Sequence, residues 1–121
     1  MSEAPKRIIL EMGTGNDLYG MDYTKAAKRA VQDAIHHSSL LLFKSLGLDP
    51  NKVMHIELTI HANEPEKVDL QAVAAELPYG TVTPKAAFGG LNIHHQETGQ
   101  TSVIVNASLD VRAALKGQIS P

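Results

Sequence analysis

One long amphipathic segment constrains the fold of this chain more than any other feature of the sequence. From Asp22 to Leu46, apolar or small residues recur with the period of an α-helix for about seven turns. Asp22 is a residue type that caps helix amino termini, and Gly47 is one that ends helices. A nearly continuous apolar strand at residues 7–12 precedes the helix, and a glycine-bearing loop at residues 13–21 joins the two. The chain is therefore predicted to open with a strand, a loop and a long helix.

Shorter patterns predict the remaining elements. Residues 53–62 alternate between apolar and polar side chains, which predicts a strand with one buried face. The other elements are bounded by proline, glycine or polar turns: a short helix at 68–77, a strand-like segment at 81–95 with a break at Pro84 and a bulge or close approach at Gly89 and Gly90, a hairpin loop at 96–100, and a strand at 101–111.

The order β-α-β-α-β-β predicts one α+β domain over residues 1–121, with a mixed four-stranded sheet and with one long and one short helix on the same face. The first two crossovers are long enough to join parallel strands, and the last two strands form a hairpin. Residues 1–6 are expected to be a flexible amino terminus and residues 113–121 to be weakly structured. The half-polar strand at 53–62 leaves the other sheet face for a subunit interface, which favours a homo-oligomer.

Composition and charge exclude several classes of partner. A net charge of −2 and a pI near 6.3 give no basic face for nucleic acid. The longest apolar run, Leu40–Phe43, is far shorter than the about 20 residues that a membrane span needs. No segment of signal-peptide type opens the chain, so a cytoplasmic location is expected. Because cysteine is absent, histidine and carboxylate are the only strong metal ligands available.

The sequence also resembles a known family. The run from Glu11 to His37, the alternating strand and the segment Leu77–Gly80 resemble the "Lin" family of conserved hypothetical proteins over nearly the whole chain. The resemblance implies no assigned reaction. The element order is also similar to that of chorismate mutase-like and YjgF-like α+β folds, whose members commonly form rings of three and place ligands between subunits. This similarity implies a homo-oligomer, a trimer or higher, with a small-molecule ligand.

The loop at residues 13–21 and the start of the long helix form the first candidate site. Backbone N–H groups at a helix amino terminus and the helix dipole favour an anion, and glycines let a ligand approach the main chain. A third glycine and a Gly-Lys-Ser/Thr sequence are both missing, so neither a dinucleotide fingerprint nor a P-loop is present. An alternative is that the glycines only build a tight turn. The ligand-binding residues proposed from this pattern are Gly13, Thr14, Gly15, Asp22, Thr24, Lys25 and Arg29.

Acid–base candidates lie on both sides of this loop. Glu11 and Asp17 flank the glycines, and His36 and His37 follow on the helix, where Asp33 is spaced to orient either ring. These groups suit a hydrolytic or proton-transfer reaction without a cofactor. Structural hydrogen bonding of the histidines is the alternative.

Lys85 is a further candidate for binding a charged group or acting as a desolvated base, and Glu11 is a possible partner for it. An exposed, solvated lysine is the alternative.

A metal site is the rival interpretation. On the strand at 53–62, His55 and Glu57 point to one face about 7 Å apart and can share a divalent metal, with a third ligand from elsewhere. His61 follows on the same face but is too far along the strand to join without curvature. A polar interface is the alternative for this row.

Together these patterns predict a small protein that binds a polar or anionic metabolite at a subunit interface and possesses histidine- and carboxylate-assisted chemistry. A non-catalytic module for metal or ligand, and a structural subunit of a larger assembly, remain as alternatives.

Overall fold

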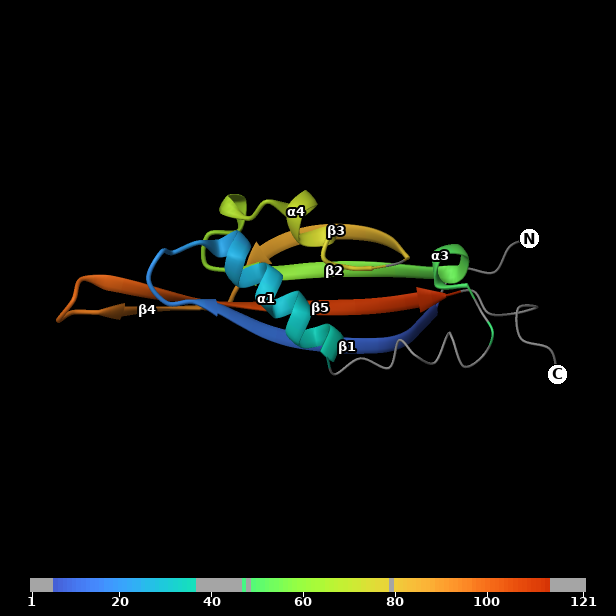
Figure 1. Cartoon of the computed structure of the whole chain (residues 1–121), viewed down its shortest axis with the longest axis horizontal. Helices are drawn as coiled ribbons and strands as arrows, with labels where there is room; N and C mark the ends of the chain where they lie inside the picture. Colours follow the sequence, from blue (N-terminus) through green and yellow to red (C-terminus); the bar gives the residue numbers. More distant parts are fainter. Residues whose placement is uncertain (1–5, 37–46, 48, 79, 114–121) are drawn as a thin grey trace.

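The computed structural model describes residues 6–36, 47, 49–78 and 80–113, which form one α+β domain around a mixed five-stranded sheet (Figure 1). The predicted fold class is therefore confirmed. The elements in chain order are β1 (Lys6–Asp17), α1 (Tyr23–His36), α3 (Pro50–Val53), β2 (Met54–Ala62), the short 3-10 helix η1 (Pro65–Lys67), α4 (Leu70–Ala74), β3 (Thr81–Phe88), β4 (Leu91–His95) and β5 (Gln100–Ala113).

The long strand β5 is the centre of the sheet. The strand order is β1-β5-β2-β3, and β4 pairs with β5. β5 runs antiparallel to β1 along one edge, and along its other edge it pairs first with β4 and then with β2. β2 and β3 are parallel neighbours, while β5 separates the parallel strands β1 and β2. The expected parallel crossovers and the terminal hairpin are thus confirmed.

The sheet has five strands rather than the expected four, because residues 81–95 divide into β3 and β4. The division falls at Gly89 and Gly90, and Gly90 has a φ of +66° that favours glycine. Pro84 does not break β3. β3 is an edge strand with a partner on one side only, and this is the position in a sheet where proline is tolerated.

The first strand is longer than its apolar run. β1 begins at Lys6 and continues through the glycines to Asp17, because β5 offers a partner along this whole length, from Ala113 opposite Lys6 to Val103 opposite Asp17. The assignment of residues 13–17 to a loop, and of Lys6 to a flexible terminus, is therefore wrong. Ala113 likewise belongs to β5 rather than to a weakly structured tail.

Helix α1 begins as expected. The backbone N–H of Lys25 donates to Asp22 Oδ1 over 3.0 Å, which confirms Asp22 as the cap. The predicted continuation to Leu46 lies outside the described residues, as do residues 1–5 and 114–121. Helix α4 is shorter than the expected 68–77, and Asp69 caps it by accepting the N–H of Ala72 over 3.1 Å. None of the described helices is long and apolar enough to cross a membrane.

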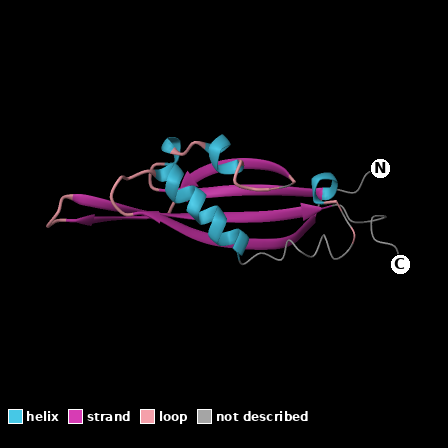
Figure 2. Ribbon diagram, in the orientation of Figure 1, coloured by secondary structure: helices cyan, strands magenta, loops and turns pink. Residues whose placement is uncertain are grey.

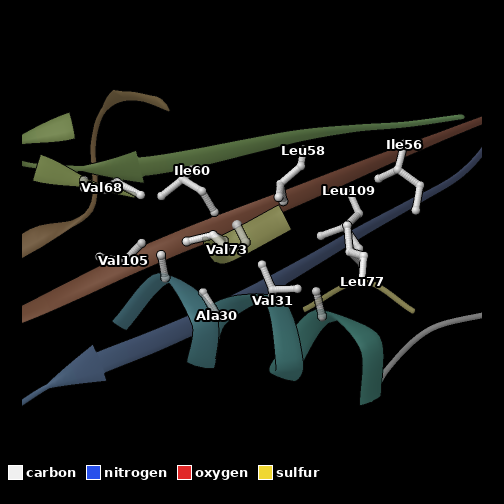
Figure 3. Close-up of a cluster of buried hydrophobic side chains, with 14 of the residues drawn as sticks. Ala30, Val31, Ile56, Leu58, Ile60, Val68, Val73, Leu77, Val105 and Leu109 are labelled. Carbon is white, nitrogen blue, oxygen red and sulfur yellow. The ribbon is translucent and has the colours of Figure 1, made fainter. Parts of the chain in front are cut away.

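One face of the sheet carries the core. α1 and α4 pack against this face, which we call the covered face (Figures 1 and 2). Figure 3 shows Val31 of α1 and Val73 of α4 turned toward Ile60 and Leu109 of the sheet. The alternation predicted for β2 is confirmed, since Met54, Ile56, Leu58, Ile60 and Ala62 are all buried.

Two glycines allow α1 to lie directly on β1. A Cβ added to Gly13 would overlap the carbonyl oxygen of Ala30, and one added to Gly15 would overlap that of Ala26. Alanines on the buried side of α1 complete this close contact. Both glycines therefore serve helix–strand packing.

The other face of the sheet, which we call the open face, has no described helix packed on it. Its side chains on β2 are exposed or half-buried, from His55 to His61. Those on β5 alternate with the core residues and include Asn106, Ser108 and Asp110. The expectation that the described helices share one face is thus met.

Candidate functional site

The loop at residues 18–22, between β1 and α1, is held from below by Asp17. The Asp17 side chain is only 9% exposed, and its Oδ2 accepts the backbone N–H of Asp22 over 3.0 Å and that of Gly20 over 3.2 Å. Met21 closes the loop with a φ of +50°, a left-handed conformation that costs a non-glycine residue energy. The loop is therefore a built structure whose strain is offset by the Asp17 contacts.

Two cations face the same carboxylate. Lys25 Nζ lies 3.6 Å and Arg29 Nη1 lies 3.9 Å from Asp17 Oδ1, and Arg29 also donates to the Asn16 carbonyl over 2.7 Å. The hydrogen bond from the Asp22 backbone lowers the pKa of Asp17 below its ordinary value, opposed by desolvation and helped by Lys25. Asp17 is thus an ionised anchor, and the two cations neutralise it.

The β4–β5 hairpin, residues 91–104, forms an arm that extends beyond the rest of the sheet (Figure 1). Its base is tied to α1 through Tyr23, whose hydroxyl accepts from Asn92 Nδ2 over 2.8 Å and donates to Glu64 Oε2 over 3.0 Å. Burial raises the pKa of Tyr23, so the phenol stays protonated and able to donate. These contacts fix the arm relative to the start of α1.

A hollow of about 670 Å³, which we call the arm cleft, lies between the arm and the loop at residues 18–22. This volume falls in the range of small-molecule sites. Leu18 and Tyr19 form its loop side, and both are exposed, by 48% and 72%. The lining residues from the arm are His94, His95, Gln96, Glu97, Thr98, Gln100 and Ser102.

A chain of hydrogen bonds links the two sides of the arm cleft. Ser102, only 6% exposed, donates its hydroxyl proton to the Leu18 carbonyl over 3.0 Å. Its Oγ lies 3.0 Å from His95 Nε2. Because the serine proton is already used, His95 Nε2 must carry the proton of this second bond. In the neutral ring, Nδ1 is then an acceptor, and Ser102 is not arranged as a nucleophile.

The predicted acid–base residues do not come together. Asp17 precedes α1 and His36 ends it, about 20 Å away for a helix of this length. Glu11 lies in β1 at one edge of the sheet, and Lys85 lies in β3 at the other. The suggested pairing of Glu11 with Lys85 is therefore wrong. His37 lies outside the described residues.

Other residues assigned to the anion site are used within the fold. Thr24 Oγ1 accepts the backbone N–H of Asp69 over 2.9 Å, which ties α1 to α4. The backbone N–H of Thr14 donates to Asp33 Oδ2 over 2.9 Å. Asp33 therefore bonds the edge of β1, in addition to lying beside His36 in a shallow hollow of about 280 Å³ on α1.

The metal interpretation meets competing contacts on the open face. Glu57 Oε2 lies 3.4 Å from Arg112 Nε, so a guanidinium already faces the carboxylate expected to bind metal beside His55. Within residues 6–36, 47, 49–78 and 80–113, no group of three or more His, Asp or Glu side chains is arranged to hold a metal ion.

The arm cleft contains residues that the sequence patterns did not assign to a site, above all Tyr19, His95 and Ser102. The His94-His95 pair next to a hairpin loop was the available signal. Because adjacent residues of a strand point to opposite faces, the pattern predicts at most one of these histidines in any given site, whereas both line the arm cleft. Only the antiparallel pairing of β4 with β5 brings His95 to Ser102.

The chain is thus an α+β protein with one covered sheet face, one open sheet face and the arm cleft. Residues 7–111 match the model of the Lin0512 family, described as conserved hypothetical proteins, and the chain belongs to that family. The resemblance seen in the sequence is thereby confirmed.

A solved structure supports the same fold. The crystal structure of an FtsZ-like protein of unknown function from Nostoc punctiforme PCC 73102 is similar, with a TM-score of 0.80 and 35% sequence identity. The match covers 92% of this chain and 98% of that one. No curated protein matches the chain.

Proposed function

We propose that this protein binds a small polar molecule in the arm cleft. The observation that carries the proposal is a hollow of about 670 Å³ with two rigid sides, the loop anchored by Asp17 and the arm histidine held by Ser102. Both sides are formed before a ligand arrives, which lowers the entropy lost on binding. Leu18 and Tyr19 belong to the loop where the sequence predicted a ligand, but none of the ligand-binding residues proposed from that pattern lines the arm cleft.

The lining residues suggest the chemistry of the ligand. Tyr19 offers an exposed aromatic face, and His95 Nδ1 offers an acceptor next to Gln100. Neither lysine nor arginine is among the described residues that line this cleft. A flat, largely neutral molecule with an N–H or O–H donor fits these groups better than a phosphate does. Of the polar or anionic metabolites that the sequence predicts as ligands, the arm cleft therefore favours a polar, uncharged one.

A proton-transfer reaction in the arm cleft would use His95. Its Nδ1 is the acceptor that a bound O–H or N–H group can reach, while Ser102 holds the ring in one orientation. Asp17 would act only through the loop, since its lowered pKa keeps it ionised. Binding in the arm cleft does not depend on this reaction.

Self-association through the open face is a second candidate property. Leu10 and Met12 of β1 lie on this face and are 45% and 67% exposed, next to rows of small polar side chains. A second copy packed there would cover both. Sedimentation velocity tests this proposal: Met12→Glu should reduce the assembly to single subunits. A wild-type chain that sediments as a single subunit at all concentrations would refute it.

Fragment binding tests the arm cleft. Nicotinamide and uracil serve as flat neutral probes and benzoate as an anionic one, followed by amide NMR shifts of residues 18–20 and 94–102. Tyr19→Ala should weaken binding by about tenfold, as expected for loss of one stacking contact. Phe88→Ala is the matched control, because Phe88 is similarly exposed, at 77%, and lies outside the cleft.

His95→Gln tests the polar side of the cleft, with His55→Gln as a control on an exposed histidine elsewhere. Binding should weaken only in the first variant. Uniform shifts without saturation, or equal binding by Tyr19→Ala and Phe88→Ala, would refute the proposed site.

A further inference from the structure

A second hollow, of about 440 Å³, lies on the open face across β1, β5 and β2, away from the arm cleft. We call it the open-face hollow. Thr14, Asn106 and His61 stand directly opposite one another on these three strands, with neighbouring strands about 4.8 Å apart. The residues that line it are Met12, Gly13, Thr14, Asp33, His61, Asn106, Ala107 and Ser108.

The Asn106 amide has a fixed orientation in this hollow. Thr14 Oγ1 donates to Asn106 Oδ1 over 3.1 Å, so the amide oxygen is occupied. The Nδ2 group, with two N–H donors, is then the part of the amide that a ligand can use. Asp33, which accepts the Thr14 backbone N–H, supports the same strand from α1.

Small residues around His61 leave the hollow its space. A Cβ added to Gly89 would lie 2.7 Å from His61 Cβ and 3.4 Å from the ring Nδ1. Ala87 is the neighbour of His61 on β3, and Asn106 is its neighbour on β5. A larger residue at position 89 would overlap the Cβ of His61. Glycine at this position therefore lets His61 keep its place beside Asn106.

We propose that the open-face hollow is a ligand site for a small neutral polyhydroxylated molecule, such as a polyol or monosaccharide. Hydroxyl groups donate and accept, and this hollow offers both: N–H donors on Asn106 and hydroxyls on Thr14 and Ser108. Met12 adds one apolar contact. No lysine or arginine is among the described lining residues, so the site does not suit phosphates, and a carboxylate ligand would be repelled by Asp33.

NMR titration of the intact chain with D-ribose and with glycerol tests this site. The signals to follow are the Asn106 side-chain amide and the backbone amides of Thr14, His61 and Ser108. We expect saturable shifts confined to these groups. tert-Butanol, which has one hydroxyl, and acetate, which is an anion, serve as control probes and should give no saturable shift at the same signals.

Asn106→Leu removes the amide donors and should weaken ribose binding by about tenfold or more. The matched control is Asn16→Leu on the same face, since Asn16 is also exposed and lies outside the hollow. Thr14→Val, which removes only the hydroxyl that orients Asn106, should weaken binding as well and guards against misfolding of the first variant. Circular dichroism checks the fold of all three variants.

Three results would overturn the inference: no saturable shift with either polyol, equal ribose binding by Asn106→Leu and Asn16→Leu, or saturation by acetate in place of ribose. These readouts use residues and probes different from those of the arm cleft. Failure at one site therefore leaves the test of the other intact.

Discussion

The two faces of one sheet follow different rules in this protein. On the covered face, β2 and β5 present only aliphatic residues to α1 and α4, and glycines bring α1 onto β1. On the open face, the same strands carry hydroxyls, an amide, imidazoles and ion pairs. Packing requires apolar residues on the covered face and makes no such requirement on the open face. A polar open face is compatible with contact with solvent, and it is also the surface on which we propose binding and assembly.

Replacing a leucine of the covered face and a leucine of the exposed arm by alanine gives the largest expected difference in the free energy of unfolding. Leu58 is fully buried on the covered face, so Leu58→Ala should lower the free energy of unfolding by about 3 kcal/mol. Leu91 on the arm is 54% exposed, and Leu91→Ala should change the free energy of unfolding by less than about 0.5 kcal/mol. Urea unfolding measures both. A large loss for Leu91→Ala would mean that a second copy covers the arm.

Adding a methyl group to a glycine tests the contact between α1 and β1. Gly15→Ala should cost about 3 kcal/mol of unfolding free energy, because the new Cβ overlaps the helix backbone at Ala26. Gly99→Ala is the control: its φ is +72°, but nothing lies within 4 Å of the new atom. That change should cost only about 1 kcal/mol from backbone strain. Equal losses would show that steric overlap is not the reason for glycine at position 15.

Local patterns were enough to predict most of the fold. The alternation at residues 53–62, the cap at Asp22 and the hairpin before β5 all depend on neighbours in sequence, and all are confirmed. The extent of β1 is different, because Gly13 and Gly15 are strand residues only through their pairing with Ala107 and Val105, respectively. A glycine-rich segment is predicted as a loop until its partner strand is known.

The candidate sites were harder to predict for the same reason. The arm cleft forms where residues 18–19 meet residues 94–102, a contact set by the pairing of β5 with both β1 and β4. Asp17 was chosen as a catalytic acid or base from its neighbours in sequence. Its two backbone hydrogen bonds, which indicate an anchor, depend on a loop conformation that the sequence pattern does not encode.

The Asp17 anchor, at the end of the covered face, has a smaller and pH-dependent effect. Asp17→Asn should lower the free energy of unfolding by about 1–2 kcal/mol near neutral pH, since a carboxylate that accepts two N–H bonds is replaced by a neutral amide. The pKa of Asp17 is lowered in the folded state from 3.8. Its contribution is therefore present above pH 3.8 and is lost as the pH falls through the folded value.

Urea unfolding from about pH 7 to about pH 3 checks this dependence. The difference between wild type and Asp17→Asn should shrink as the pH falls. Asp69→Asn is the control, because asparagine caps a helix as well as aspartate does. A difference that does not change with pH would contradict the role of Asp17 as an ionised anchor.

The smallest expected effect is on the open face, at Asp110. Arg7 binds this carboxylate with two bonds of 3.1 and 3.0 Å, and Arg112 adds a third of 3.1 Å. The Arg7 hydrogen bonds lower the pKa of Asp110, so its contribution also lies above pH 3.8 and is lost in acid. Asp110→Asn should nevertheless cost less than Asp17→Asn, because the Arg7 side chain is 53% exposed and solvent screens the pair.

The effect of salt distinguishes Asp110 on the open face from Asp17 at the end of the covered face. Added sodium chloride should reduce the difference in unfolding free energy between wild type and Asp110→Asn, since exposed charges are screened. It should reduce the Asp17→Asn difference less, because two backbone N–H groups hold that carboxylate in addition to the exposed Lys25 and Arg29. If the Asp110 difference also resists salt, water does not reach the ion pair in solution. A second copy would then have to cover the open face, and Met12→Glu should restore the salt dependence by separating the copies.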